Sequence, residues 1–590
     1  MTRSKTIKIF LFSFSIIFFS SAELSNLISA AKSGNSFNES EYYGSDKEWV
    51  ESRLASMTLR EKIAQMIISY SNGYLQDENS QEFGRLRLLT EDEKIGGFIF
   101  FKGSSVEECK LINRLQEFSE TPLLMSADFE RGTKMRLDDG SLFPNNMALG
   151  ATRNADLAYQ MGFQIAKECR AIGIHQNYAP VMDINNNPDN PIINVRSFGE
   201  DPGLVSELGS AMIKGLQDGG IIATAKHFPG HGDTDIDSHS DLPVLNFSRE
   251  RLDNLELIPF KNAVTAGVRS VMIAHLSLPS VDDEPFLPAS LSSKIIDGIL
   301  IKEMGFKGLV VTDALNMAGV VKHFTAEEVA LKCVNAGVDL ILMPQGESKT
   351  ISAIENAVNS GSISEERINE SVRKILKAKS WLKLDQNKYT DPNNVPAAVN
   401  SEKEKQISSQ IADESITLVI NKDDVIPFKN SSEKKCLVVS LNNGNEKANS
   451  DYFVSYFEKN NSFKESFLYD ISGEVTNPNE IISDAANSDI IIIPVYAKVK
   501  IKTGSVGLPS SQLSLINSLT ATGKKVVVIS FGNPYLIQGF PDVDSYICAY
   551  ADAESSITSA VNALNGIIKF KGKLPVSISQ EFKYGYGITN

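Results

Sequence analysis

Cysteine is scarce in this sequence, which has five cysteines among 590 residues. They are Cys109, Cys169, Cys333, Cys436 and Cys548. An odd number, widely spaced in apolar or helical contexts, fits neither a disulfide framework nor a zinc site. We therefore expect five buried free thiols.

Clusters of positive charge are also missing. The chain has 58 Lys and Arg against 73 Asp and Glu, a formal net charge of −15 at pH 7. This balance argues against nucleic acid or an anionic membrane surface as a partner, because both bind basic patches. Otherwise the composition, 42% hydrophobic and 22% charged, is that of a soluble globular protein. With no internal repeat and this length, at least two domains are expected.

A short apolar run, Ile9–Phe19, lies near the N-terminus. Three basic residues precede it: Arg3, Lys5 and Lys8. Small residues at Ser20 and Ala22 complete the pattern of a secretory signal peptide, and the run is short for a membrane span. No cysteine follows it, so a lipoprotein anchor is not supported. We predict a signal peptide over residues 1–22 and an exported protein, periplasmic or secreted, with no stable membrane insertion after cleavage; an uncleaved anchor is the alternative.

Residues 48–384 alternate short apolar runs with amphipathic stretches. Eight runs have the character of strands: "IAQMIIS", "GGFIFF", "PLLMSAD", "HQNYAPVMDI", "ATAKHFPG", "SVMIAHLSLP", "GLVVTDAL" and "DLILMP". Helical stretches between them, such as "ADLAYQMGFQIAKECRAIG", end at glycine, as helix C-termini often do. Strands that alternate with helices imply parallel pairing with right-handed crossovers, and eight of them indicate a (β/α)8, TIM-like barrel. A doubly wound open sheet is the alternative.

The rest of the chain predicts a second, smaller domain. Residues 385–404 are polar, contain proline and show no period, which indicates a linker. From 405 to 590 apolar strands return, separated in part by helical stretches such as "PSSQLSLINSLTATG". We expect an α/β sandwich built on an open parallel sheet. Residues 23–47 are assigned to an N-terminal linker.

Polar side chains stand where the predicted barrel strands end. They are Asp128, Asp183, Lys226, His227, His275 and Asp313. In a (β/α)8 barrel the C-terminal ends of the strands share one face, which carries the active site. One polar strand end means little, but the convergence of several predicts a site.

The stretch "KHFPGHGDTDIDSHSDLP" (226–243) concentrates three of the six histidines and four aspartates. Its "DTDIDSH" segment begins like a calcium loop, but Ser238 and Val244 replace the glycine and glutamate that such a loop needs. The three histidines lack zinc-ligand spacing. We therefore expect no metal and no cofactor.

Acid/base chemistry suits the same stretch better. Asp237 and His239 are two residues apart, so in an extended segment they point to the same side. The carboxylate would fix the imidazole tautomer and raise its basicity, while the other ring nitrogen faces a substrate. With Asp313 across the mouth of the barrel, the pair would form a two-group catalyst.

The whole stretch resembles the signature of the β-N-acetylhexosaminidase branch of glycoside hydrolase family 3. Supporting similarity lies in "NYAPVMDINNNPDNPIINVRSFGEDP" (177–202) and "LPASLSSKIIDGILIKEMGFKGLVVTDALNM" (287–317). The second domain is similar to the α/β sandwich of two-domain members, as in "ESITLVIN" and "SFGNPY". The resemblance covers about residues 48–590.

This resemblance implies a retaining exo-β-N-acetylglucosaminidase, with a carbohydrate as its partner. It would hydrolyse terminal non-reducing β-N-acetylglucosamine from peptidoglycan fragments or chitooligosaccharides. Asp313 would be the nucleophile that forms a covalent glycosyl-enzyme. His239 would be the general acid/base, assisted by Asp237, in place of the second carboxylate of most glycosidases.

The resemblance also implies a sugar-binding set. Asp128, Arg136, Arg196, Lys226 and His227 match family positions that contact the hydroxyls of the terminal sugar, and His275 is counted with them. One segment departs from the family's D-x-E-G-G-R pattern, because "DFERGTKMR" has Arg131-Gly132-Thr133 in place of Gly-Gly-Arg. Loss of the first glycine is expected to change the shape of the sugar pocket.

Two other functions remain open from the sequence. In a phosphorylase, phosphate instead of water would take the sugar from Asp313, and a histidine acid/base suits an anionic acceptor. A catalytically inactive sugar-binding protein is the other alternative. The presence of Asp313, Asp237 and His239 argues against it.

Overall fold

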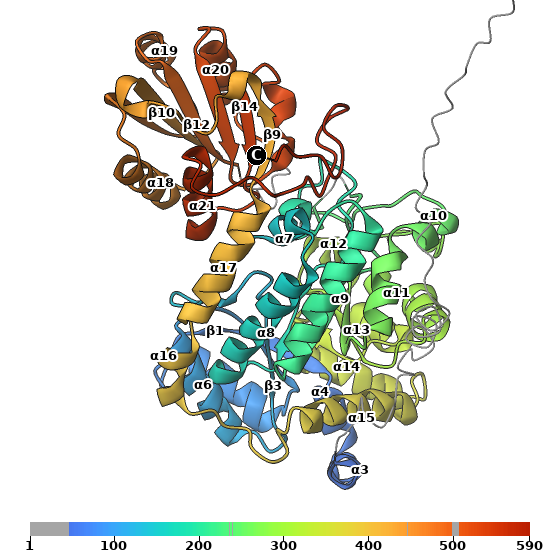
Figure 1. The fold of residues 1–590 in the computed structure, drawn as a ribbon. Coiled ribbons are helices and arrows are strands. Elements are labelled where there is room, and N and C mark those ends of the chain that lie inside the picture. Colours follow the sequence, from blue (N-terminus) through green and yellow to red (C-terminus); the bar gives the residue numbers. More distant parts are fainter. Residues whose placement is uncertain (1–45, 235–236, 239, 445, 498–506, 590) are drawn as a thin grey trace, which may run out of the picture. The chain divides into compact units, whose positions relative to one another are not determined.

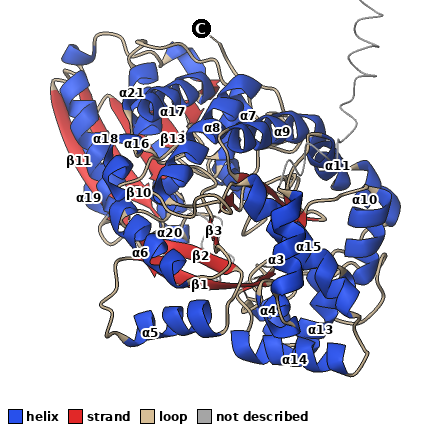
Figure 2. Ribbon diagram, turned by 90° about the horizontal axis from the view of Figure 1, so that it is seen from below, coloured by secondary structure: helices blue, strands red, loops and turns tan. Residues whose placement is uncertain are grey.

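The computed structural model describes residues 46–234, 237–238, 240–444, 446–497 and 507–589. Two sheets, each accompanied by helices, organise this part of the chain (Figures 1 and 2). The predicted signal peptide and most of the N-terminal linker lie outside the described residues. No helix within the described ranges is long and apolar enough to cross a membrane.

The first sheet has eight parallel strands in the order β7-β6-β5-β4-β3-β2-β1-β8. A further parallel bridge between Val311 and Leu340 brings its two ends together, so the sheet is a nearly closed barrel. This confirms the predicted (β/α)8 barrel. The strands are β1 (Ile67–Gly73), β2 (Gly97–Gly103), β3 (Leu124–Ala127), β4 (Gln176–Asn177), β5 (Ile222–Phe228), β6 (Ser270–Ile273), β7 (Leu309–Thr312) and β8 (Ile341–Leu342).

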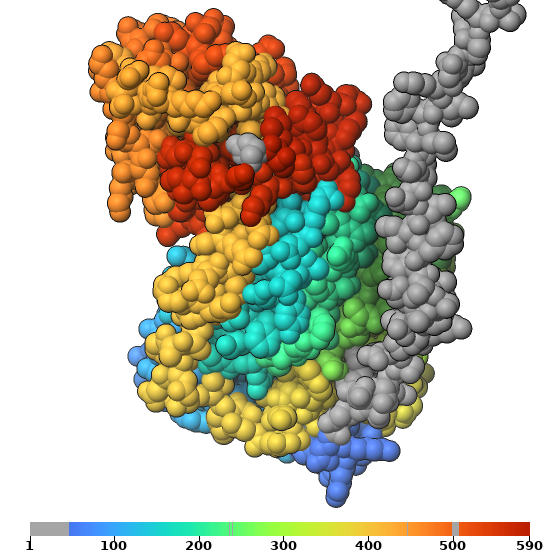
Figure 3. Space-filling view, in the orientation of Figure 1, coloured from blue at the N-terminus to red at the C-terminus, as the bar shows by residue number. Residues whose placement is uncertain are grey.

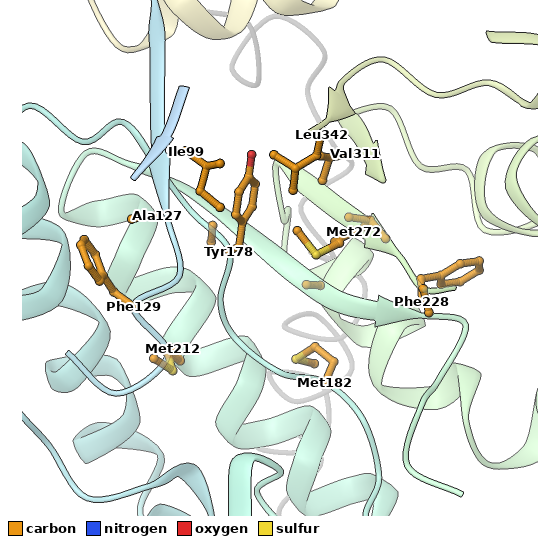
Figure 4. Packing of buried hydrophobic residues seen from close by; sticks show 14 of the residues in the cluster. Ile99, Ala127, Phe129, Tyr178, Met182, Met212, Phe228, Met272, Val311 and Leu342 are labelled. Atoms are coloured by element: carbon orange, nitrogen blue, oxygen red, sulfur yellow. The ribbon is translucent and has the colours of Figure 1, made fainter. Parts of the chain in front are cut away.

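Most barrel strands are buried and mainly apolar, although β1 has two exposed residues and β4 is the buried polar pair Gln176–Asn177. Every residue of β5, β6 and β7 is buried. Figure 4 shows residues of this core, among them Ile99, Met272 and Val311. A polar layer crosses the same interior, where Gln176 donates to the hydroxyls of Thr224 (3.1 Å) and Ser270 (3.0 Å).

Helices surround the barrel, and local signals set their ends. Helix α8 begins after Asn154, whose side chain caps its first turn, and ends at Gly173 with φ 101°. Helix α9 begins after Asp201, which accepts from the Leu204 N–H, with Pro202 at its first position. The helices are α3 (Lys47–Ser56), α4 (Leu59–Ala64), α5 (Gln81–Arg87), α6 (Ser105–Phe118), α7 (Asn146–Thr152), α8 (Ala155–Ile172), α9 (Pro202–Asp218), α10 (Arg249–Asn254), α11 (Leu257–Thr265), η5 (Lys294–Glu303), α12 (Ala318–Val321), α13 (Ala326–Ala336), α14 (Glu347–Asn359) and α15 (Glu365–Trp381).

The second sheet has six strands in the order β11-β10-β12-β13-β14-β9. They are β9 (Thr417–Asn421), β10 (Lys435–Asn442), β11 (Glu465–Ser472), β12 (Ile490–Tyr496), β13 (Lys525–Ser530) and β14 (Ser545–Cys548). The helices of this domain are α18 (Lys447–Asn460), α19 (Pro478–Ala486), α20 (Ser510–Thr520) and α21 (Glu554–Leu564). The prediction of a purely parallel sheet was wrong at one edge, where β9 runs antiparallel to β14. The prediction also missed β11, an edge strand of exposed and half-buried residues without an apolar run.

The segment predicted as a linker, 385–404, is ordered against the barrel. It contains η6 (Pro392–Asn394) and α16 (Val395–Ala398), and it leads into α17 (Glu402–Ser415). The Asn400 N–H donates to Glu168 Oε1 at 2.7 Å, and Thr390 exchanges hydrogen bonds with the Asn113 side chain. Helix α17 packs against α7 and α8 (Figure 3). These hydrogen bonds tie the polar segment to the barrel.

All five cysteines are buried and unpaired, as predicted. Burial raises the pKa of the Cys109 thiol to about 11, and it raises the pKa of the other four thiols as well. A thiol with a raised pKa carries little thiolate, so none of the five has the character of a nucleophile or a metal ligand.

Candidate active site

A cavity of about 460 Å³ lies at the C-terminal ends of the barrel strands. Six residues singled out from the sequence line it: Asp128, Arg136, Arg196, Lys226, His227 and Asp313. They come from four different strand ends or the loops that follow them, as expected for a barrel active site. The structure thus brings these six together in one place.

Lys226, at the end of β5, bridges two carboxylates. Its ammonium donates to Asp128 Oδ1 at 3.0 Å and lies 2.8 Å from Glu130 Oε1. Burial lowers the pKa of Lys226, but the two carboxylates outweigh burial and raise it. The side chain therefore stays cationic in a buried place.

Glu130 is a site residue that the sequence reasoning missed. It holds Arg196 in a bidentate pair, with contacts of 3.0 Å to Nε and 2.7 Å to Nη2. Burial would raise the pKa of Glu130, but Arg196 and Lys226 hold it well below its ordinary value. A signal was available, because residues 128 and 130 are two apart in an extended segment and so face the same side.

Asp183 is buried, does not line the cavity and holds two histidines in position. Its buried carboxylate lies 2.7 Å from His227 Nδ1 and accepts from the His231 backbone N–H, also at 2.7 Å. Burial would raise the pKa of Asp183, but His227 above all lowers it. His227 Nε2 lies 3.5 Å from Arg196 Nη2, which can only donate. This arrangement fits the tautomer that carries its proton on Nδ1.

Asp313 follows the last residue of β7 and faces the cavity. Its Oδ1 accepts from the Ala314 N–H at 2.8 Å, while Oδ2 accepts no hydrogen bond from any described residue. Burial would raise the pKa of Asp313. His275, His227, the Ala314 N–H and Lys226 together outweigh burial and lower the pKa to about 2. The carboxylate is therefore ionised, with one oxygen open toward the cavity.

His275 lies elsewhere than the sequence suggested. It is not among the described residues that line the cavity. Its Nδ1 is 2.7 Å from Ser290 Oγ, and its Nε2 is 3.1 Å from the Ala314 carbonyl oxygen. The prediction placed His275 late in a strand, but β6 ends at Ile273, and the His275 side chain contacts the segment that carries Asp313.

The predicted Asp237–His239 pair is described only in part, because His239 lies outside the described residues. Asp237 is buried, and its carbonyl oxygen accepts from the N–H groups of Ser240 (2.8 Å) and Asp241 (3.1 Å). Ser238 lines the cavity. The chain next to His239 therefore borders the same cavity as Asp313, and the roles of the pair stay predictions.

His231 has both ring nitrogens beside hydroxyl groups. Nδ1 lies 2.9 Å from Thr234 Oγ1 and Nε2 lies 3.1 Å from Ser238 Oγ. Burial, and then the neighbouring His227, lower the pKa of His231 to about 4. Across the parts of the chain that are described, no three His, Cys, Asp or Glu side chains are grouped so as to hold a metal ion.

Two family models match the chain, one for each sheet. The glycosyl hydrolase family 3 N-terminal domain matches residues 58–378, and the family 3 C-terminal domain matches residues 416–586. The first match includes every cavity residue named above.

Among curated proteins, β-hexosaminidase A of Pseudoalteromonas piscicida is 28% identical over 82% of this chain and 89% of its own length. A β-N-acetylglucosaminidase/β-glucosidase of Cellulomonas fimi is 27% identical over 90% of this chain and 95% of its own length. Among solved structures, a β-N-acetylglucosaminidase of the same family from Paenibacillus sp. FPU-7 is 33% identical over 89% of this chain and 99% of its own, with a TM-score of 0.76. A β-glucoside phosphorylase is 27% identical over 91% of this chain and 98% of its own, with a TM-score of 0.82.

Proposed function

The chain belongs to glycosyl hydrolase family 3, and from this premise we propose that it is a retaining exo-β-N-acetylglucosaminidase. The observation that carries the proposal is the state of Asp313. It is a carboxylate held ionised, with one oxygen open, in a cavity whose other acids are neutralised by paired cations. Such a group is suited to attack carbon, and not to donate a proton.

The paired charges would bind the terminal sugar. Asp128 and Glu130 already orient Lys226, and Glu130 orients Arg196, so little ordering is needed when sugar hydroxyls arrive. Hydrogen bonds to charged groups are strong and directional, which suits the recognition of hydroxyl positions. Binding in this set would place the anomeric carbon against Asp313.

The reaction would proceed in two displacements at that carbon. Asp313 attacks the carbon as His239 gives a proton to the departing oxygen, which leaves a covalent sugar ester on Asp313. His239 then takes a proton from water, and the water oxygen displaces Asp313 from the opposite face. Two inversions retain the β configuration.

Both the relatives and the sequence bear on the substrate class. Relatives that bear the names β-hexosaminidase and β-N-acetylglucosaminidase support an amino sugar at the cleaved end. Chitooligosaccharides and peptidoglycan fragments both provide this end. The N-terminal pattern of a signal peptide supports action outside the cytoplasm, in the periplasm or after secretion.

The decisive test compares nitrophenyl β-N-acetylglucosaminide with nitrophenyl β-glucoside. The first should be cleaved with much the higher kcat/KM. A slow fluorosugar should then label the enzyme, and mass spectrometry should place the adduct in "GLVVTDALNM", with no adduct in Asp313→Asn. A label elsewhere, or an inverted product, would rule out this mechanism. Sugar binding without turnover would favour an inactive binding protein.

Phosphorolysis is the second candidate, favoured by the similarity to a solved β-glucoside phosphorylase. In that case phosphate would attack the ester on Asp313 and yield a sugar 1-phosphate. Phosphorus NMR of reactions with and without phosphate separates the two functions. Free sugar formed at the same rate in both reactions identifies a hydrolase.

A further inference from the structure

Arg131 stands where the family pattern given above has its first glycine, and it lines the active-site cavity. The guanidinium lies 3.1 Å from Asp552 of the second domain, through Nη1 and Oδ1. The Arg131 side chain is 20% exposed, whereas that of Asp552 is 7% exposed. Residues far apart in sequence thus meet at the edge of the site.

Backbone hydrogen bonds fix the loop around Arg131, and they therefore also fix the direction in which its side chain leaves the loop. The Arg131 carbonyl oxygen accepts from the Phe143 N–H at 2.9 Å. Nearby, Asn145 also lines the cavity and donates to the carbonyl oxygen of Tyr550 at 2.7 Å. Two side chains of this part of the wall are therefore held by the same short stretch of the second domain.

Arg131 differs from the other cavity cations in how its charge is balanced. Arg136, Lys226 and Arg196 pair with carboxylates that themselves line the cavity. Among the described residues, the one ion-pair partner of Arg131 is Asp552, which does not line the cavity and also accepts from Asn449 at 3.1 Å.

Most N–H donors of the Arg131 guanidinium have no hydrogen-bond partner among the described residues. A guanidinium has five N–H donors, and one hydrogen bond from this side chain to a described residue is present. The remaining donors sit in a planar fork that matches a carboxylate or a phosphate.

We propose that Arg131, held in place by Asp552, is an anion-binding subsite that selects substrates with a carboxylate near the cleaved bond. This rests on the proposed glycosidase function and narrows its substrate class. An amino sugar linked to a second sugar with a lactyl ether carboxylate has the required chemistry. An inorganic phosphate that enters as acceptor is the other source of an anion.

The test uses the full-length enzyme and two substrates that differ only in charge. One is a disaccharide of two N-acetylglucosamines, and the other carries a lactyl ether on the second sugar. The quantity measured is the ratio of their kcat/KM values, charged over neutral. Arg131→Gln should lower this ratio roughly 10- to 100-fold, as expected when hydrogen bonds to a charged group are lost. Asp552→Asn should lower it less, because the arginine remains.

Arg153→Gln is the matched control. Arg153 also joins the barrel to the second domain, through Tyr584 Oη (2.9 Å) and the Leu574 carbonyl (3.3 Å), but it does not line the cavity. It should leave the ratio of the two substrates as in wild type. If Arg131→Gln merely loosens the domains, both variants will lower Tm and both rates alike, and the proposal is wrong.

The remaining outcomes separate the proposal from its premise. If wild type cleaves neither disaccharide, the proposed function fails. If it cleaves both and Arg131→Gln leaves the ratio unchanged, the subsite alone fails. If the ratio is unchanged but Arg131→Gln weakens phosphate-dependent formation of sugar phosphate, the anion is phosphate and the carboxylate proposal is overturned.

Discussion

At the scale of single residues, Asp313 has a charge that its surroundings determine. A buried carboxyl group ordinarily has a raised pKa. Here nearby histidines, a backbone N–H and Lys226 reverse that effect and bring the pKa to about 2. A nucleophile needs its charge, so activity that depends on ionised Asp313 exists above this pKa and is lost as pH falls through it.

His275 is the group that lowers this pKa most. His275→Gln keeps a donor for the Ala314 carbonyl but removes the imidazole, so the pKa of Asp313 should rise. The acid limb of kcat/KM, which reports free-enzyme groups, should move to higher pH. His323→Gln is the control, because His323 stacks on the exposed Phe286 and does not line the cavity. An acid limb that does not move would mean that His275 only packs.

His239 should matter in proportion to how much the leaving group needs a proton. General acid catalysis typically contributes about 10²–10⁴-fold. His239→Ala should therefore depress cleavage of a disaccharide far more than glycosyl-enzyme formation from a nitrophenyl glycoside. Azide should speed its turnover, because azide attacks without losing a proton. Equal losses on both substrates without an azide effect would assign the acid/base to another residue.

At the scale of elements, the loop after β3 carries much of the site. It supplies Asp128, Glu130, Arg131 and Arg136 within nine residues, from 128 to 136. Thr133 and Ser141 both donate to the buried Glu168, and these hydrogen bonds fix the path of the loop. The shape of this loop therefore sets the geometry of four charged side chains.

Gly132 is the point where this loop tolerates least change. Its φ is +110°, and an added Cβ would meet the Ser141 carbonyl oxygen at 2.3 Å. Gly132→Ala should lower Tm and also kcat/KM. Gly267→Ala is the matched control, because Gly267 has φ +79° with no atom within 4 Å of an added Cβ. The control carries only the positive-φ cost, about 1–2 kcal/mol, and Gly132→Ala should exceed it in chemical denaturation. Equal losses of stability in the two variants would show that the loop relaxes and relieves the contact with the Ser141 carbonyl oxygen.

At the scale of the whole molecule, buried neutral histidines should make stability depend on pH. Burial lowers the pKa of His231 to about 4, and it lowers the pKa of His175 well below the ordinary value. In the unfolded chain both titrate near 6.5. The unfolded state then binds more protons below that pH, so stability is full above about pH 6.5 and falls toward pH 4.

Calorimetry across this range tests the expectation. Tm should fall as pH is lowered from about 6.5 toward 4, and His231→Gln should flatten part of the slope because it removes one titrating group. A slope that His231→Gln leaves unchanged would assign the pH dependence to other groups.

The second domain also contacts loops of the barrel that border the site. Its Tyr535 hydroxyl accepts from Asn185 at 2.9 Å, and its Ser577 binds Glu200 through N–H (2.7 Å) and hydroxyl (2.6 Å). Asn185 and Glu200 lie in the loop between β4 and α9 that also carries Arg196. Contacts from one domain thus help to hold the loop of the other that carries a cavity-lining arginine.

The sequence by itself determined the barrel and much of its active face. Buried parallel strands are mainly apolar, so an apolar run marked a place near each of the eight; β4 itself is polar, and the apolar residues after it marked its position. The polar residues at their ends had to converge, because parallel strands share one carboxyl edge. This is why Asp128, Lys226 and Asp313 were found together.

Only the tertiary structure decided which partner each charged side chain has. Glu130 between Arg196 and Lys226, and Arg131 against Asp552, join residues up to 421 positions apart. No local pattern encodes such partners. The same holds for the ordered segment 385–404 and for the edge strand β11, because their hydrogen bonds come from distant groups. Apolar patterns record burial, which is a local property of the sequence, whereas charge pairing depends on which surfaces the completed fold brings together.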